Sequence, residues 1–104
     1  MRRQKSMTGG LEPVHPGALL REDLLPALKM PKAEVARALG ISRAQLYAML
    51  RERAPVTAPM ALRLGRFFGN GPELWLNMQS NYDLQTLSRS MAREIARIPQ
   101  IKAA

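Results

Sequence analysis

Apolar residues along the chain recur at steps of three and four, the spacing that places side chains on one face of an α-helix. No stretch alternates apolar and polar residues as a half-buried β-strand does, and no internal repeat is visible. The pattern therefore predicts an all-α protein. The apolar sets that predict successive helices are Leu19, Leu20, Leu24 and Leu28; Val35, Ala36 and Leu39; Leu46, Met49 and Leu50; Leu62, Leu64, Phe67 and Phe68; Leu74, Trp75 and Met78; and Leu87, Met91, Ile95 and Ile98.

Prolines, glycines and hydroxyl residues between these sets predict where the helices begin and end. The predicted boundaries are Pro16 and Pro31 as helix starts, Gly40 and Gly69 as stops, Ser42 and Thr57 as N-caps, and Pro72 as the start of a fifth helix that runs to about Tyr82. Pro26 is expected to end or kink the first helix, because proline removes a backbone hydrogen bond. A separate sixth segment is expected over 84–98, ended by Pro99.

The stretch from Lys32 to Arg51 has the spacing of a helix-turn-helix. Two short helices that cross steeply come very close, so the contact position on the first helix must be small, and Ala36 meets that need. Gly40 supplies the backbone conformation of the turn, and Ile41 is expected to fill its corner. The second helix would then face Leu46 and Met49 inward and leave its other side for DNA.

The exposed side of this second helix carries residues suited to reading DNA. Arg43 can bond a guanine edge, Gln45 an adenine edge, and Ala44 can touch a thymine methyl group. Small side chains let the helix enter the major groove, and Tyr47 is open between a base, a phosphate and a packing role. Phosphate contacts would fix register without reading sequence. The full set of predicted DNA-binding residues is Lys32, Ser42, Arg43, Ala44, Gln45, Tyr47, Ala48, Arg51 and Arg53.

Charge strengthens this interpretation, because the net charge is +8 and residues 29–56 hold six basic against two acidic residues. A concentrated positive region is typical of proteins that bind polyanions. The chain has no Cys and a single His, so the sequence predicts no metal site, no cofactor and no enzyme activity. No apolar run reaches the length of a membrane span, and we expect a cytoplasmic protein without a membrane partner.

From His15 to Leu84 the chain resembles the HigA-type antitoxins, a branch of the XRE-like repressors. The matching blocks are His15-Pro16-Gly17, Leu20-Arg21-Glu22-Asp23, Val35 to Ile41, Ala61-Leu62-Arg63-Leu64, Phe68-Gly69, Pro72 to Gln79, and Asn81-Tyr82-Asp83-Leu84. The resemblance implies a five-helix, lambda-repressor-like DNA-binding domain over 13–83 with an extra C-terminal helix and tail over 84–104. Residues 1–12 are expected to be a disordered basic extension.

The resemblance further implies a homodimer that binds double-stranded operator DNA, represses its own operon and neutralises a HigB-type toxin that cleaves mRNA. Two features depart from the family's pattern. After the second helix of the helix-turn-helix the family usually has Asn-Gly and a basic residue, where this chain has Arg51-Glu52-Arg53. Before the fifth helix the usual Ser or Thr cap is replaced by Asn70-Gly71.

Several alternatives stay open at this stage. The helix-turn-helix equally suits a stand-alone transcriptional regulator without a toxin partner, and a basic, amphipathic C-terminal helix suits a module that binds membranes or RNA. The segment from Leu84 could pack on its own domain, form a dimer arm or contact the toxin. Trp75 and Tyr82 are expected in the core, and His15 at a helix start or in packing.

Overall fold

The structure is a computed structural model that describes residues 13–102. Within this range the chain forms six helices and no strand, when the continuous helical stretch of residues 16–28 is counted as one helix. The predicted all-α fold class is confirmed. The extension over residues 1–12 lies outside the described residues, so its expected disorder stays a prediction.

The first helical stretch is built from α2 (Pro16–Leu19), a π-helical turn η1 (Leu20–Leu24) and α3 (Leu25–Leu28). His15 caps it, because its Nδ1 accepts a hydrogen bond of 2.9 Å from the Gly17 N–H. The stretch does not end at Pro26 but two residues later. The π turn widens the helix just before the proline, which then stands in the first turn of α3, where its missing N–H costs no hydrogen bond.

Helices α4 (Lys32–Leu39) and α5 (Arg43–Leu50) form the predicted helix-turn-helix. Gly40 takes the left-handed conformation, with a φ of 74°, and the Ile41 N–H bonds back to the Ala36 carbonyl oxygen at 3.0 Å. Ser42 caps α5 as expected. Helix α6 (Ala58–Phe68) follows a loop, begins at the Thr57 cap and ends at Gly69, both as the sequence predicts.

The core lies where the first helical stretch, α4, α5, α6 and the start of α7 (Pro72–Ser90) meet. Trp75 is fully buried at its centre, and its indole N–H donates to the Asn70 side chain at 3.0 Å. The expected core position of Trp75 is therefore confirmed. Leu62 and Leu74 belong to the apolar sets that predict α6 and α7, but they lie outside the core and are 62% and 43% exposed.

Close approach of backbones fixes α5 on the first helix. A Cβ atom added to Gly17 would overlap the main-chain carbonyl of Met49. Because that contact involves backbone rather than a flexible side chain, only glycine fits there. The buried His15 ring also packs edge-on against Tyr82 of α7, with ring centres 4.9 Å apart. His15 thus has both of the roles expected of it, at a helix start and in packing.

Helix α7 does not end near Tyr82. It continues without a break to Ser90, and only a single turn at Met91 separates it from α8 (Ala92–Ala96). The sequence prediction of a separate segment beginning at Leu84 is wrong, because 82–86 contain no proline or glycine and Thr86 bonds back to the helical carbonyl of Tyr82. The division of the chain at residues 83 and 84 thus falls inside a continuous helix.

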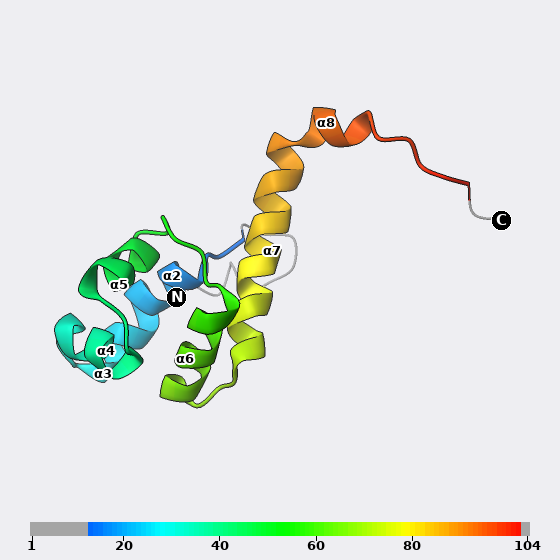
Figure 1. Cartoon of the computed structure of the whole chain (residues 1–104). Helices are drawn as coiled ribbons and strands as arrows, with labels where there is room; N and C mark the ends of the chain where they lie inside the picture. The colour runs from blue at the N-terminus through cyan, green and yellow to red at the C-terminus, as the bar shows by residue number, and fades with distance from the viewer. Residues whose placement is uncertain (1–12, 103–104) are drawn as a thin grey trace.

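The outer half of α7 and α8, which we call the C-terminal arm (residues 84–98), stands away from the other helices (Figure 1). The radius of gyration is 16.4 Å, against about 13 Å for a compact chain of 100 residues. The arm therefore does not pack on its own domain, which removes one of the three alternatives. Its exposed apolar side chains are Leu84, Leu87, Met91, Ile95 and Ile98.

Candidate nucleic-acid interface

The outer face of α5 is the centre of the candidate site, because its inner face is fully used by the core. Leu46, Met49 and Leu50 are buried, whereas Arg43, Ala44 and the polar Gln45 are exposed. Tyr47 is 37% exposed. The exposed face of α5 is therefore narrow and includes the small side chain of Ala44, as expected for a helix that enters a major groove.

Ser42 and Gln45 are tied to each other at the start of α5. The Ser42 hydroxyl accepts from the Gln45 N–H at 3.0 Å, and the Gln45 side-chain oxygen accepts from the Ser42 N–H at 2.9 Å. This reciprocal pair is a capping box, and its sequence signature, Ser followed three residues later by Gln, is visible at 42 and 45. The amide oxygen of Gln45 is therefore engaged within the protein.

The other end of α5 carries a stacked pair and a folded-back loop. The Arg51 guanidinium carbon lies 5.7 Å from the centre of the Tyr47 ring, within the range of a cation–π contact. The N–H groups of Arg53 and Ala54 bond to the Ala48 carbonyl oxygen at 2.9 and 3.3 Å. Because the loop turns back over this part of the helix, Ala48 is only half-exposed, not fully outward as the helical spacing suggests.

Lys32 lies at the first residue of α4, on an exposed turn whose N–H groups no side chain caps. Uncapped N–H groups and the positive end of the helix dipole together favour an anion at this position. Of the nine predicted residues, eight are exposed and Ala48 is half-exposed. They belong to α4, the turn before α5, α5 itself and the loop after it, so the fold gathers them in the helix-turn-helix and its flanking loop.

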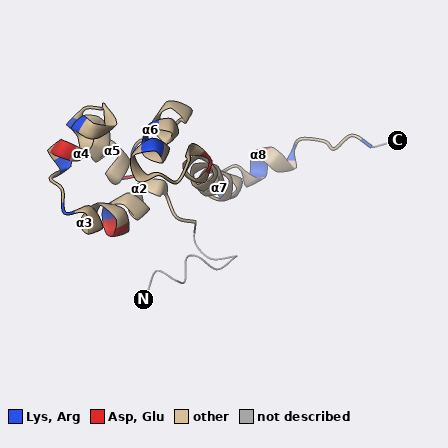
Figure 2. Cartoon of the chain, turned by 90° about the horizontal axis from the view of Figure 1, so that it is seen from below, with Lys and Arg blue, Asp and Glu red and all other residues tan. Residues whose placement is uncertain are grey.

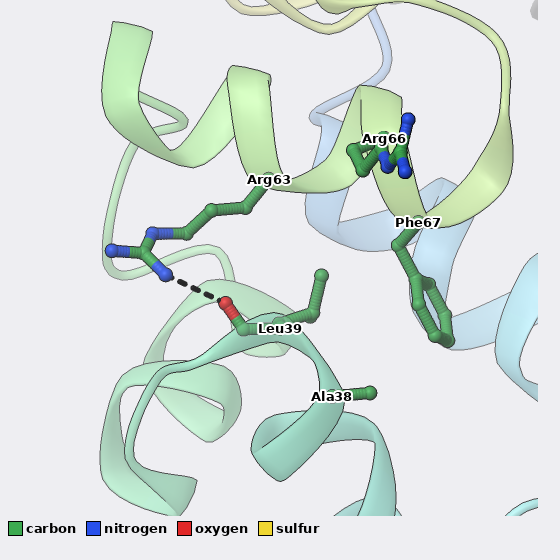
Figure 3. A pocket seen from close by; sticks show the side chains of 5 residues that line it. All are labelled: Ala38, Leu39, Arg63, Arg66 and Phe67. Atoms are coloured by element: carbon green, nitrogen blue, oxygen red, sulfur yellow. Dashed lines mark hydrogen bonds between the residues drawn. The ribbon is translucent and has the colours of Figure 1, made fainter.

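Two arginines outside the helix-turn-helix close the ends of its helices, and the sequence predicts no role for either of them. Arg63 of α6 donates to the Leu39 carbonyl oxygen at 2.8 Å (Figure 3). It also donates to the Gly40 carbonyl oxygen at 3.3 Å. Arg21 of η1 donates to the Leu50 carbonyl oxygen at 2.7 Å. Both satisfy carbonyls that lack a partner at a helix C-terminus. The partners are 24 and 29 residues apart in sequence, so no local pattern could reveal them.

Near the turn, Ala38, Leu39, Arg63, Arg66 and Phe67 line a shallow hollow between α4 and α6. Figure 2 shows basic residues both on the helix-turn-helix side and on α8 with the tail beyond it.

No group of three His, Asp or Glu side chains is placed to hold a metal within residues 13–102. Over the same residues, every helix is too short or too polar to cross a membrane.

A buried polar side chain of α7 holds the loop that follows α5. Gln79 is buried, and its side-chain oxygen accepts from the Val56 N–H at 2.8 Å, while its amide donates to Asp83 at 3.0 Å. Burial lowers the pKa of His15 from its ordinary value, against the smaller opposing effect of Glu52 and Asp83. His15 is therefore favoured in its neutral form, the form whose Nδ1 can accept the cap bond from Gly17.

Comparison with known proteins agrees with this geometry. The family model described as Helix-turn-helix matches residues 20–76. Virulence-associated protein I of Dichelobacter nodosus is 42% identical over 72 residues, which are 69% of this chain and 67% of that protein. The structure of antitoxin GraA in complex with its operator has a TM-score of 0.81 at 39% identity, covering 94% of this chain and 99% of that one.

A third similar structure is the Pseudomonas aeruginosa antitoxin HigA with the higBA promoter. Its TM-score is 0.80 at 34% identity, and the match covers 88% of this chain and all of that one. The chain therefore belongs to the helix-turn-helix family and, within it, to the HigA-type antitoxins.

Proposed function

We propose that the chain is the antitoxin of a type II toxin–antitoxin system, which binds its own operator as a homodimer and represses its own operon. It also neutralises a HigB-type toxin that cleaves mRNA. It acts where the chromosome and mRNA lie, in the cytoplasm, as a regulator rather than an enzyme. The observation that carries the proposal is the exposed face of α5, held in a helix-turn-helix whose relatives GraA and HigA are solved on operator and promoter DNA.

In this proposal Arg43 reads a guanine edge and Ala44 contacts a thymine methyl group in the major groove. Lys32, Arg51 and Arg53 bind phosphates and fix the register of the helix. Gln45 enters differently from its sequence interpretation, because its amide oxygen is already bonded to the Ser42 N–H. A two-point contact with adenine would open the capping box, so Gln45 reads at most through its free amide N–H groups.

Homodimerisation would place two copies of α5 in successive major grooves, about 34–36 Å apart. The C-terminal arm is the surface that supports this part of the proposal. Its apolar residues lie at helical spacing and are between 36% and 68% exposed, so the described part of the chain covers them only in part. Exposed apolar stripes of this kind mark surfaces that another chain covers.

The DNA-binding part is tested by fluorescence anisotropy on a duplex from the chain's own promoter and on a shuffled duplex. We expect Arg43→Ala to lose about 1–3 kcal/mol of specific affinity and to keep its non-specific affinity. Arg66→Ala is the matched control, because Arg66 is also exposed but belongs to α6. An equal loss of specific affinity in both variants would show that positive charge alone, and not the exposed face of α5, determines specificity.

The toxin part is tested by co-expressing the chain with the reading frame adjacent to its gene. We expect the neighbour's product to cleave mRNA, and the chain to bind it and stop the cleavage. Arg43→Ala should still neutralise, because the reading face is proposed to touch only DNA. A neighbour that neither cleaves mRNA nor binds the chain would leave a stand-alone repressor.

A further inference from the structure

Glu52, the second residue after α5, has a left-handed backbone with a φ of 62°. A residue with a Cβ atom disfavours this conformation, which glycine adopts freely. Gly40 supplies it after α4, with a φ of 74°, but at the matching place after α5 the chain uses a glutamate. Something other than intrinsic preference must therefore hold Glu52 in place.

Two backbone bonds close the turn, from the Glu52 N–H to the Met49 carbonyl oxygen at 3.0 Å and from the Arg53 N–H to the Ala48 carbonyl oxygen at 2.9 Å. Arg21 adds the side-chain contacts that hold Glu52 from outside the turn. One nitrogen of its guanidinium, Nη1, donates both to the Leu50 carbonyl oxygen at 2.7 Å and to the Glu52 carboxylate at 3.1 Å. Leu50 is the last residue of α5, so a single nitrogen bonds the end of the helix and the strained residue beyond it. Hydrogen bonds to Glu22 and Glu52 raise the pKa of Arg21, which stays charged.

The position of Glu52 matters because it lies between two arginines of the candidate interface. Arg51 stacks on Tyr47, and Arg53 bonds through its N–H to the Ala48 carbonyl oxygen, on either side of the left-handed residue. The backbone angles of Glu52 therefore set the direction of Arg53 relative to Arg51. Two phosphates of a duplex have a fixed separation, so both arginines bind well only in one relative placement.

We propose that Arg21 is a positioning residue for operator binding, which acts through Glu52 to hold Arg51 and Arg53 in register with the phosphate backbone. Arg21 touches no DNA in this proposal. It replaces, by a contact across 31 residues of sequence, the conformational freedom that a glycine would bring to the loop. The proposal rests on the operator binding proposed above.

The sharpest test compares Glu52→Gly with Glu52→Ala, because both remove the same carboxylate and differ only in their preference for the left-handed conformation. On operator DNA we expect Glu52→Ala to bind about five- to tenfold more weakly than Glu52→Gly. The slope of log affinity against log salt should fall by about 0.9 for each phosphate that the protein no longer binds. Equal affinities and equal slopes in the two variants would overturn the proposal.

A mutant cycle identifies Arg21 as the partner. Arg21→Ala should weaken operator binding and lower the salt slope in the wild-type background, but should change both much less in the Glu52→Gly background. Glu22→Ala removes the other carboxylate on Arg21, bonded at 2.7 Å, and should leave affinity and slope unchanged. An equal effect of Arg21→Ala in both backgrounds would show that Arg21 acts by charge or by stability alone.

All variants are measured at a temperature at which circular dichroism shows them fully folded. If Arg21→Ala does not fold, Arg21→Met, which keeps the aliphatic part of the side chain and loses the hydrogen bonds to Leu50 and Glu52, takes its place in the cycle. Failure of the wild-type chain to prefer its own promoter would contradict the proposed function. Normal wild-type binding with no difference within the Glu52 pair would contradict only the role of Arg21.

Discussion

The helix-turn-helix and the C-terminal arm are both helical, but they are stabilised in opposite ways. Each helix of the former ends on a specific partner, with Arg63 on the end of α4 and Arg21 on the end of α5, and both helices bury one face. The arm also has an apolar face, yet none of residues 91–102 is buried. One region is therefore complete within a single chain, whereas the other leaves an apolar face exposed, as the proposed homodimer requires.

Helix α7 is buried at its start and exposed towards its end. The largest expected effect on the free energy of unfolding therefore comes from a substitution at its start. Trp75→Ala should lower the free energy of unfolding by about 3–5 kcal/mol, because it removes the largest fully buried side chain and leaves a cavity. Urea unfolding followed by circular dichroism measures the loss. Leu87→Ala on the outer half is the control, and in dilute monomer it should change stability by less than about 0.5 kcal/mol.

The second prediction tests what completes the arm. Leu87→Glu together with Ile95→Glu should convert a dimer to a monomer, since burial of each such side chain contributes about 1.5–3 kcal/mol. Sedimentation velocity over a range of concentrations measures the change, and the circular dichroism of the domain should stay the same. The exposed Leu62→Glu on α6 is the control. A double variant that keeps the mass of the parent would place the dimer contact elsewhere.

A smaller effect is expected at the turn between α4 and α5. Gly40→Ala should cost about 1–2 kcal/mol, because the φ of 74° disfavours a Cβ atom. The added Cβ would also come within 2.6 Å of the Arg63 Nη1, which must then leave the end of α4. Thermal unfolding gives the cost, and Gly69→Ala, with a φ of 75° and no neighbour within 4 Å of the added atom, separates strain from the displacement of Arg63.

The smallest expected effect concerns pH. Because the pKa of His15 is lowered in the folded protein, the unfolded chain binds more protons at mildly acidic pH. The contribution of neutral His15 to stability is therefore complete above the unfolded pKa of about 6.5, and it falls as the pH drops through that value towards the lower, folded one. Urea midpoints at pH 7.5 and 5.5 measure the fall. His15→Asn, which keeps a capping oxygen, should reduce it.

Local features of the fold were predictable because they are decided by neighbouring residues. Ala36, Gly40 and Ser42 fix the turn through contacts within six residues, and both the turn and the cap lie where the sequence places them. The capping box of Ser42 and Gln45 was equally readable but was interpreted as base contact. The assignment of the nine DNA-binding residues stays a prediction until binding is measured.

Features that depend on distant contacts could not be predicted. Arg21 and Arg63 look like surface charges until α5 and α4 are placed against them. Glu52 itself does not signal a left-handed residue, because glutamate rarely adopts that conformation. The only hint is the family's usual Asn-Gly, where this chain has Arg51-Glu52. The outward positions of Leu62 and Leu74 likewise depend on which faces of α6 and α7 the core leaves open, and helical spacing alone does not decide that.

The unbroken course of α7 from Pro72 to Ser90 has a geometric consequence for any paired assembly. Because each residue of an α-helix turns it by about 100°, one residue inserted after Tyr82 would rotate the C-terminal arm by that angle relative to the helix-turn-helix. In a dimer joined through the C-terminal arms, the two helix-turn-helix units would then no longer face the same side of the DNA duplex. In such an assembly the length of this helix, counted in single residues, sets the spacing of the half-sites that the pair can occupy.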